Sequence, residues 1–181
     1  MRKLAALLAL VASPALATEL TIEIEGEANG TVTIDLFEDV APGHVEQIAA
    51  LAAEGKYDGV VFHRVIDGFM AQTGDVQFGK MGGDMSRAGM GGSERPDLTA
   101  EFSKESFDRG VVGMARGPNP NSANSQFFIM FAPAPHLNGQ YTIVGKVTDG
   151  MDVVDAIKRG TGNNGSVVGQ PDMMKSVTVI K

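Results

Sequence analysis

The sequence predicts a mainly β fold, in which many antiparallel strands close into a barrel that two helices plug or cap. Three observations predict it. Several segments alternate apolar and polar residues, as half-buried strands do. Only two segments have a helical period, and neither an internal repeat nor a domain linker interrupts the 181 residues. A chain of this length is typical of one domain with a substantial core.

The first two predicted strands form a hairpin. Glu19–Glu25 alternates strictly, with leucine and isoleucine on one side and threonine and glutamate on the other. Thr31–Phe37 alternates in the same way, and Asn29-Gly30 supplies a turn between them. Each strand therefore has one face for the core and one for solvent.

Two helices are predicted. Ala41–Glu54 has apolar residues at i, i+3, i+4 and i+7, with Pro42 in its first turn and Gly55 after its end. The second predicted helix is Asp149–Arg159, with Val153, Val154 and Ile157 turned inward.

The rest of the chain consists of short strands and glycine-rich loops. Asp67-Gly68 predicts a second hairpin, and the segment 76–97, rich in glycine and methionine, has no strand or helix period. The further predicted strands are Val60–Ile66, Met70–Gly74, Val111–Ala115, Ser125–Phe131, Tyr141–Val147 and Ser176–Ile180.

Composition excludes several classes of function. Without cysteine, the chain has no disulfide and no thiolate metal site, and its three histidines are scattered. We therefore expect neither a metal nor a cofactor. The formal net charge of −7 argues against nucleic acid as a partner, because phosphate binding needs a basic surface.

The first 17 residues have the pattern of a cleavable export signal. Met1-Arg2-Lys3 is basic, Leu4–Ala12 is apolar, and Ala15-Leu16-Ala17 fits a cleavage site. We expect residues 1–17 to be removed and residues 18–181 to form the domain. We expect this domain to be exported without attachment to a membrane, and we prefer the periplasm to outright secretion as its location. Cleavage leaves 13 basic (15 minus Arg2 and Lys3) and 22 acidic residues, a formal charge of −9.

Arg64 is the first candidate functional residue. A cation among apolar neighbours such as Phe62 and Phe69 is costly unless it is paired or used. If 60–66 is one strand, Phe62, Arg64 and Ile66 share a face. The alternative is that Arg64 only pairs with Asp67. His63 falls on the opposite face, where a structural histidine with its hydrogen bonds satisfied is favoured over a catalytic base.

Two neighbouring strands complete a predicted ligand pocket. Met70 and Gln72 share a face, and so do Gln126, Phe128 and Met130. Brought together with Arg64, they would form an apolar patch with two amides and a guanidinium at its rim. That composition is typical of a small ligand pocket.

Six motifs follow one another along residues 62–147: Phe62-His63-Arg64, Gly68–Asp75 (GFMAQTGD), Gly113–Arg116 (GMAR), Asn124–Ile129 (NSQFFI), His136–Gly139 (HLNG) and Val144–Val147 (VGKV). Together they resemble the cyclophilin family of peptidyl-prolyl isomerases. The resemblance covers nearly all of residues 18–181 and implies a closed barrel of about eight antiparallel strands capped by two α-helices. It also implies proline-containing polypeptides as substrates and no cofactor.

The resemblance implies a role for each site residue. Arg64 matches the catalytic arginine. Phe69, Met70, Phe128 and Leu137 match the wall of the proline pocket, and Phe62 matches a supporting aromatic residue. Gln72 and Gln126 match the amides that hold the peptide backbone. Ala115 and Arg116 match the loop that meets the residues before the proline.

Three positions depart from the family pattern. Arg116 stands where asparagine is frequent, and its added cation would favour acidic peptides. His136 occupies a position that often holds tryptophan, which the family links to cyclosporin binding, so we expect weak cyclosporin inhibition. Tyr141 stands where many members have histidine, which puts that histidine's contribution in doubt here.

Other functions compete with isomerisation. One is a non-catalytic chaperone or peptide-binding module with a cyclophilin shape. A hydrolase is disfavoured, because the chain has no cysteine and no serine in a nucleophile-elbow pattern. A scaffold that acts through the 76–97 loop is the third. No heptad or long exposed strand demands assembly, and we expect a monomer that folds or holds exported proteins.

Overall fold

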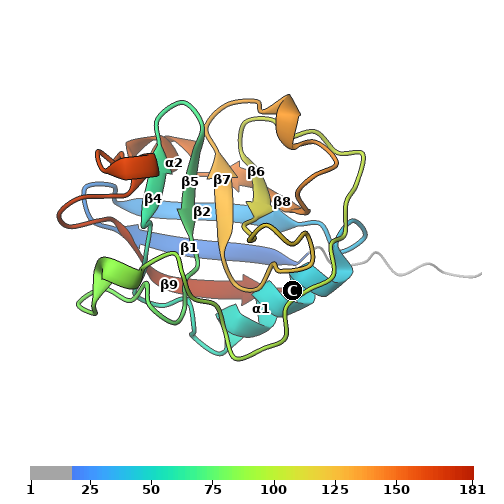
Figure 1. Ribbon diagram of the computed structural model, residues 1–181, viewed down its shortest axis with the longest axis horizontal. Helices are drawn as coiled ribbons and strands as arrows, with labels where there is room; N and C mark the ends of the chain where they lie inside the picture. Colours follow the sequence, from blue (N-terminus) through green and yellow to red (C-terminus); the bar gives the residue numbers. More distant parts are fainter. Residues whose placement is uncertain (1–17) are drawn as a thin grey trace, which may run out of the picture.

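The structure is a computed structural model that describes residues 18–181. The predicted export signal, residues 1–17, lies outside the described residues. Within 18–181 the protein is mainly β with two α-helices, as the sequence predicted, and its strands form one nine-stranded antiparallel sheet (Figure 1). Among these residues no helix is long and apolar enough to cross a lipid bilayer.

The sheet is a single curled ladder with the strand order β3-β9-β1-β2-β8-β6-β7-β5-β4. It has nine strands instead of about eight because the predicted strand 60–66 is split in two. The strands are β1 (Glu19–Glu25), β2 (Gly30–Leu36), β3 (Val60–Val61), β4 (Arg64–Ile66), β5 (Met70–Thr73), β6 (Val111–Met114), β7 (Phe127–Met130), β8 (Ile143–Asp149) and β9 (Met173–Ile180).

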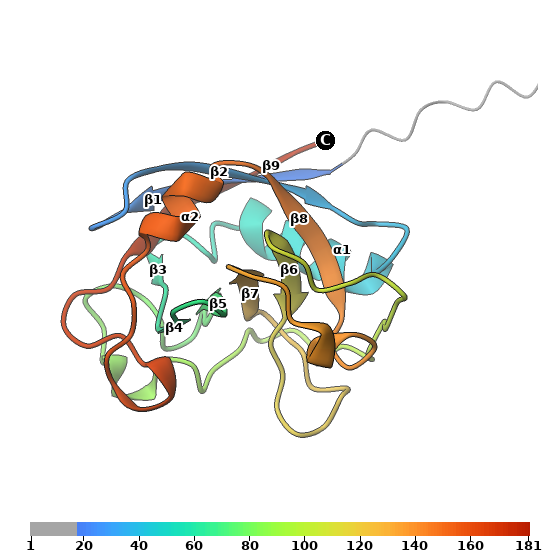
Figure 2. The same ribbon diagram turned by 90° about the horizontal axis from the view of Figure 1, so that it is seen from above.

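The two end strands of the sheet are consecutive in the chain. β3 and β4 are the end strands, and only Phe62 and His63 separate them in the chain (Figure 2). The expected common face of Phe62 and Arg64 is wrong, because the chain leaves the strand conformation between them. Phe62 is fully buried in the main core, whereas Arg64 is half-buried at the surface.

The first helix, α1 (Pro42–Ala53), is within one residue of the prediction at each end. Its buried face packs on β9, and the carboxylate of Glu101 accepts the backbone N–H groups of Gly43 and His44 at 3.1 Å each. This carboxylate satisfies two donors that the first turn of a helix otherwise leaves free. The helix therefore begins where the sequence placed it.

The second helix, α2 (Met151–Ala156), is shorter than the predicted 149–159. Asp149 still belongs to β8, Gly150 turns the chain with φ of 86°, and Ile157 is already extended. A side chain at Gly150 would collide with the backbone of Thr31, so glycine is required there. α2 packs against β2, and the two helices lie at opposite ends of the molecule (Figures 1 and 2).

The core follows the alternation of the strands. In the hairpin of β1 and β2, Ile22 faces Val32 and Leu20 faces Ile34, and all four side chains are buried. A second, smaller apolar cluster lies apart from this core. It contains Met70, Phe128 and Leu137, and it forms the floor of the candidate site.

The loop 76–97 is better organised than its sequence suggested. It contains one turn of 3₁₀ helix, Met85–Arg87, and Lys80 forms an isolated bridge with Val60. The buried carboxylate of Asp75 and the side-chain amide of Asn124 each make several hydrogen bonds to it.

Candidate active site

A cavity of about 170 Å³ opens at the surface beside β4, β5 and β7. Nine of the twelve site residues that the sequence predicted line it. They are Arg64, Phe69, Met70, Gln72, Ala115, Arg116, Phe128, Leu137 and Tyr141. The other three, Phe62, Gln126 and His136, lie behind or beside this cavity.

Strand register places the central side chains in one row. Arg64 on β4 faces Gln72 on β5, and Gln72 in turn faces Phe128 on β7. Residues directly opposite each other on neighbouring strands lie on the same face of the sheet. The row therefore has a cation at one end, an amide in the middle and an aromatic ring at the other end.

The guanidinium of Arg64 is held by neutral acceptors. Its Nε–H donates to the Asn164 carbonyl at 2.9 Å, Nη2 to Asn164 Oδ1 at 3.1 Å, and Nη1 to Gln72 Oε1 at 3.0 Å. The Sδ atom of Met70 lies 4.0 Å from Nη1. Asn164 is a neighbour that the sequence analysis missed, since no local pattern connects it to Arg64.

No carboxylate pairs with Arg64 within residues 18–181. Asp67, the partner in the alternative interpretation, instead forms an ion pair with Arg159 at 2.9 Å. Burial lowers the pKa of the Arg64 guanidinium, while the proximity of Tyr141 raises it. An arginine stays charged at any physiological pH, so Arg64 contributes a positive charge that no carboxylate of residues 18–181 neutralises by direct pairing.

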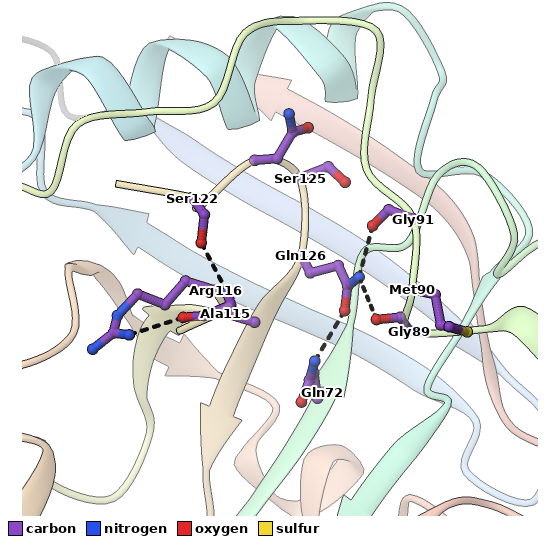
Figure 3. Close-up of a pocket in the computed structure, with 11 residues that line it drawn as sticks. Gln72, Gly89, Met90, Gly91, Ala115, Arg116, Ser122, Ser125 and Gln126 are labelled. Atoms are coloured by element: carbon purple, nitrogen blue, oxygen red, sulfur yellow. Dashed lines mark hydrogen bonds between the residues drawn. The ribbon is translucent and has the colours of Figure 1, made fainter. Parts of the chain in front are cut away.

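Behind the row, two glutamine amides continue the hydrogen bonding (Figure 3). Gln72 Nε2 donates to Gln126 Oε1 at 2.9 Å. Gln126 Nε2 donates to the carbonyls of Gly89 and Gly91 at 3.0 and 2.7 Å. Each amide has one defined orientation, because its oxygen accepts and its nitrogen donates. Arg64 is thus connected through Gln72 and Gln126 to the 76–97 loop.

Asp75 anchors the part of the 76–97 loop to which Gln126 donates its hydrogen bonds. Its side chain is fully buried and accepts four backbone N–H groups. Oδ1 accepts from Gln77 at 3.1 Å and Phe78 at 2.9 Å, and Oδ2 accepts from Gly89 at 2.7 Å and Gly91 at 3.0 Å. No local pattern marks Asp75 for this role, because its partners lie up to 16 residues away.

A second hollow adjoins the first and shares Gln72, Ala115 and Arg116 with it (Figure 3). Gln126 and the exposed side chain of Met90 line this hollow. The site is therefore an elongated depression, with an apolar cavity at one end and backbone and amide groups at the other.

Aromatic contacts support the apolar cavity. The ring of Phe128 stacks on that of Phe107, with centroids 5.8 Å apart, and meets Tyr141 edge-on at 6.0 Å. His136 lies outside the cavity and stacks on Phe69 at 5.9 Å. The Arg116 guanidinium lies 4.4 Å above the Tyr141 ring, at the rim of the cavity.

His63 is buried, as expected of a structural histidine. Within the described residues neither ring nitrogen has a partner at standard hydrogen-bond geometry, although the Val61 backbone and the Gln126 side chain lie close enough to raise the pKa of the ring, so its hydrogen bonds are weaker than expected. Burial lowers the pKa of His63 to about 4, and the Asp75 carboxylate opposes that shift. The ring is neutral at neutral pH. Within residues 18–181, no group of three or more histidine, aspartate or glutamate side chains is placed to hold a metal ion.

The family profile described as "Cyclophilin type peptidyl-prolyl cis-trans isomerase/CLD" matches residues 20–179. The chain belongs to the cyclophilin family. A protein of Brucella suis named "Probable peptidyl-prolyl cis-trans isomerase" is 61% identical to this cyclophilin over 153 residues, which cover 83% of the chain and 78% of the relative. The human "Peptidyl-prolyl cis-trans isomerase-like 3" is 39% identical over 130 residues, with 72% and 77% covered.

Solved cyclophilin structures share its fold. A Cryptosporidium parvum cyclophilin superposes with a TM-score of 0.76 at 26% identity, covering 92% of this cyclophilin and 99% of that chain. A second structure of that parasite protein, determined in the presence of the dipeptide Ala-Pro, has a TM-score of 0.74 at 26% identity, with 90% and 99% covered. The chain is accordingly a cyclophilin-type peptidyl-prolyl isomerase.

Proposed function

We propose that this cyclophilin accelerates the rotation of X–Pro bonds in exported proteins, with Arg64 as its catalytic residue. One observation carries the assignment of Arg64: within residues 18–181 its permanently charged guanidinium has only neutral partners, and it lies beside the side chains of Phe69, Met70, Phe128 and Leu137. Such an arrangement is suited to a substrate with an apolar ring and a neighbouring atom that gains electron density.

Proline isomerisation requires no bond to be broken. Rotating a peptide bond costs about 18–20 kcal/mol, because amide resonance must be lost. The catalyst therefore needs to bind the twisted amide more tightly than either planar form. In the twisted state the proline nitrogen becomes pyramidal and gains a lone pair, which a hydrogen-bond donor can stabilise.

Arg64 can supply that donor without losing its position. Of the five N–H donors of an arginine, three are used by Asn164 and Gln72. One N–H on each terminal nitrogen remains, and that of Nη1 has only the Met70 sulfur at 4.0 Å. Because the rest of the guanidinium is fixed, little reorganisation is needed when charge develops on the proline nitrogen.

The remaining site residues hold the substrate on either side of the rotating bond. The proline ring would lie against Phe69, Met70, Phe128 and Leu137, which line the cavity. Gln72 and the backbone of Ala115 and Arg116 would hold the preceding segment, since they line both hollows. Gln126 and Phe62 support this surface from behind, and His136 and Tyr141 complete the rim.

The proposed clients are unfolded or partly folded exported proteins that contain proline. The N-terminal sequence pattern supports export, with the periplasm as the preferred location. The Ala-Pro dipeptide used with the parasite cyclophilin supports X–Pro segments as ligands. We propose a monomer that works without cofactor, metal or nucleic acid and is not attached to a membrane after signal cleavage.

The test is an isomerisation assay on residues 18–181 with an Ala-Pro peptide. Arg64→Ala should lower turnover at least tenfold, about 1.4 kcal/mol of barrier. Arg109→Ala is the matched control, because Arg109 pairs with Asp155 and does not line the cavity. Turnover of Arg64→Ala equal to that of the control would remove Arg64 from the mechanism.

The same variants separate catalysis from holding. A non-catalytic chaperone would suppress aggregation of an unfolded client equally well with and without Arg64, and the wild type would not accelerate X–Pro exchange. Isomerisation and aggregation assays on the wild type and Arg64→Ala therefore distinguish the two functions.

A further inference from the structure

Arg64 lies on an end strand of the sheet. Its strand, β4, ends the ladder, so one side of β4 has no neighbouring strand. An arginine on a free edge has many rotamers, and binding would have to order it. The environment of that edge therefore decides how well the guanidinium is prepared for catalysis.

The loop after α2 covers this edge (Figure 1). Gly160 N–H donates to the Val65 carbonyl at 2.9 Å, and Val167 N–H donates to the His63 carbonyl at 3.0 Å. Ser166 forms an isolated bridge with Arg64 itself. The loop thus takes the place of a neighbouring strand, and its tip is fixed relative to Arg64.

Asn164, at this tip, has an unusual backbone conformation. Among residues 18–181 it is the only residue other than glycine with a positive φ, 54°. This left-handed conformation is costly for most side chains, although asparagine tolerates it better than most. Strained residues of this kind are frequent at functional sites, where the strained conformation itself places a group.

The conformation points two acceptors of Asn164 at the same guanidinium. The carbonyl oxygen accepts Nε–H at 2.9 Å, and Oδ1 accepts from Nη2 at 3.1 Å. Together with Gln72 at Nη1, they define the plane and rotation of the guanidinium. The remaining N–H groups are those left to the substrate.

We propose that Asn164 is a positioning residue of this cyclophilin, which fixes the Arg64 guanidinium for the twisted amide. The proposal rests on the catalytic role of Arg64 proposed above. Asn164 acts through Arg64, so its loss affects the transition state more than the binding of the planar peptide. Loss of Asn164 should therefore lower kcat and leave KM nearly unchanged.

Asn164→Gly tests this, because glycine adopts the left-handed conformation freely and keeps the backbone carbonyl. Only the Oδ1 acceptor is removed. We expect kcat for an Ala-Pro peptide to fall roughly five- to tenfold, as small misplacements of a catalytic group do, while KM stays within about twofold. In NMR spectra, the Arg64 Nε–H signal should persist while rotation about the Nε–Cζ bond becomes faster.

Asn163→Gly is the matched control. It removes the same amide and adds the same backbone freedom one residue away, and the Asn163 side chain is exposed without a hydrogen bond to Arg64 among the described contacts. We expect wild-type kcat and wild-type guanidinium signals from it.

Three results would overturn the proposal: equal kcat in both variants, a loss confined to KM, or unchanged guanidinium rotation in Asn164→Gly. If Arg64→Ala abolishes turnover while Asn164→Gly does not lower it, this inference fails and the proposed function stands. A wild-type protein that does not accelerate X–Pro exchange would instead refute the proposed function.

Discussion

Asp75→Asn should destabilise the protein by about 3 kcal/mol. The buried carboxylate accepts four backbone N–H groups, and an asparagine oxygen can serve only one of the two pairs. Each hydrogen bond to a charged group contributes about 1.5–3 kcal/mol. Losing two would cost about 3–6 kcal/mol, and we take the lower value because a neutral amide is less costly to bury. For a domain of this size, the unfolding midpoint should fall by about 6–12 °C.

Urea unfolding and amide exchange measure this loss. Gly89 and Gly91 amides, which Asp75 holds, should exchange faster in Asp75→Asn than in the wild type. Asp84→Asn is the control in the same loop, because Asp84 is exposed and caps Ser86, a role that asparagine fills equally well. The reasoning is refuted if Asp75→Asn and Asp84→Asn unfold at the same urea concentration.

Three further predictions concern single side chains. Phe128→Ala removes most of one wall of the cavity, so the KM of an X–Pro peptide should rise several-fold; an unchanged KM would contradict the assignment. The pKa of His63 is lowered by burial to about 4 from 6.5, so the unfolded chain takes up the proton first as pH falls. The free energy of unfolding should therefore decrease between pH 6.5 and 4, by up to about 3 kcal/mol, and urea unfolding of His63→Gln should lack this part. His136 packs on Phe69 at the position where the family resemblance implies tryptophan, and we expect weak inhibition by cyclosporin; a nanomolar inhibition constant would show otherwise.

Local pattern was sufficient for much of the fold. Glu19–Glu25 was predicted with its observed bounds, since one buried face imposes strict alternation on a strand. The bounds of α1 were predicted within one residue, because the apolar stripe, Pro42 near its start and Gly55 after its end all indicate the same helix. The break between β3 and β4 was not predictable in this way. Val60–Ile66 has strand propensity throughout, and the break comes from distant partners: Phe62 N–H donates to the Asp172 carbonyl.

The site was predicted to the extent that its residues lie on strands or in motifs. Arg64, Gln72 and Phe128 form a row because β4, β5 and β7 are neighbours in the sheet. Asn164 lies 100 residues from Arg64 in the chain, and its contribution depends on a backbone angle, not on a residue pattern. The four donors gathered by Asp75 depend on how a loop returns to the sheet, which composition does not encode.

The position of β9 has a consequence for how the protein is made. This strand, formed by the last residues of the domain, is inserted between β3 and β1, which both come from the first third of the chain. A ribosome, which releases the chain from its N-terminus, therefore delivers β9, the middle strand of these three, last. Until it arrives, β1 and β3 expose unpaired edges to whatever protein is nearby.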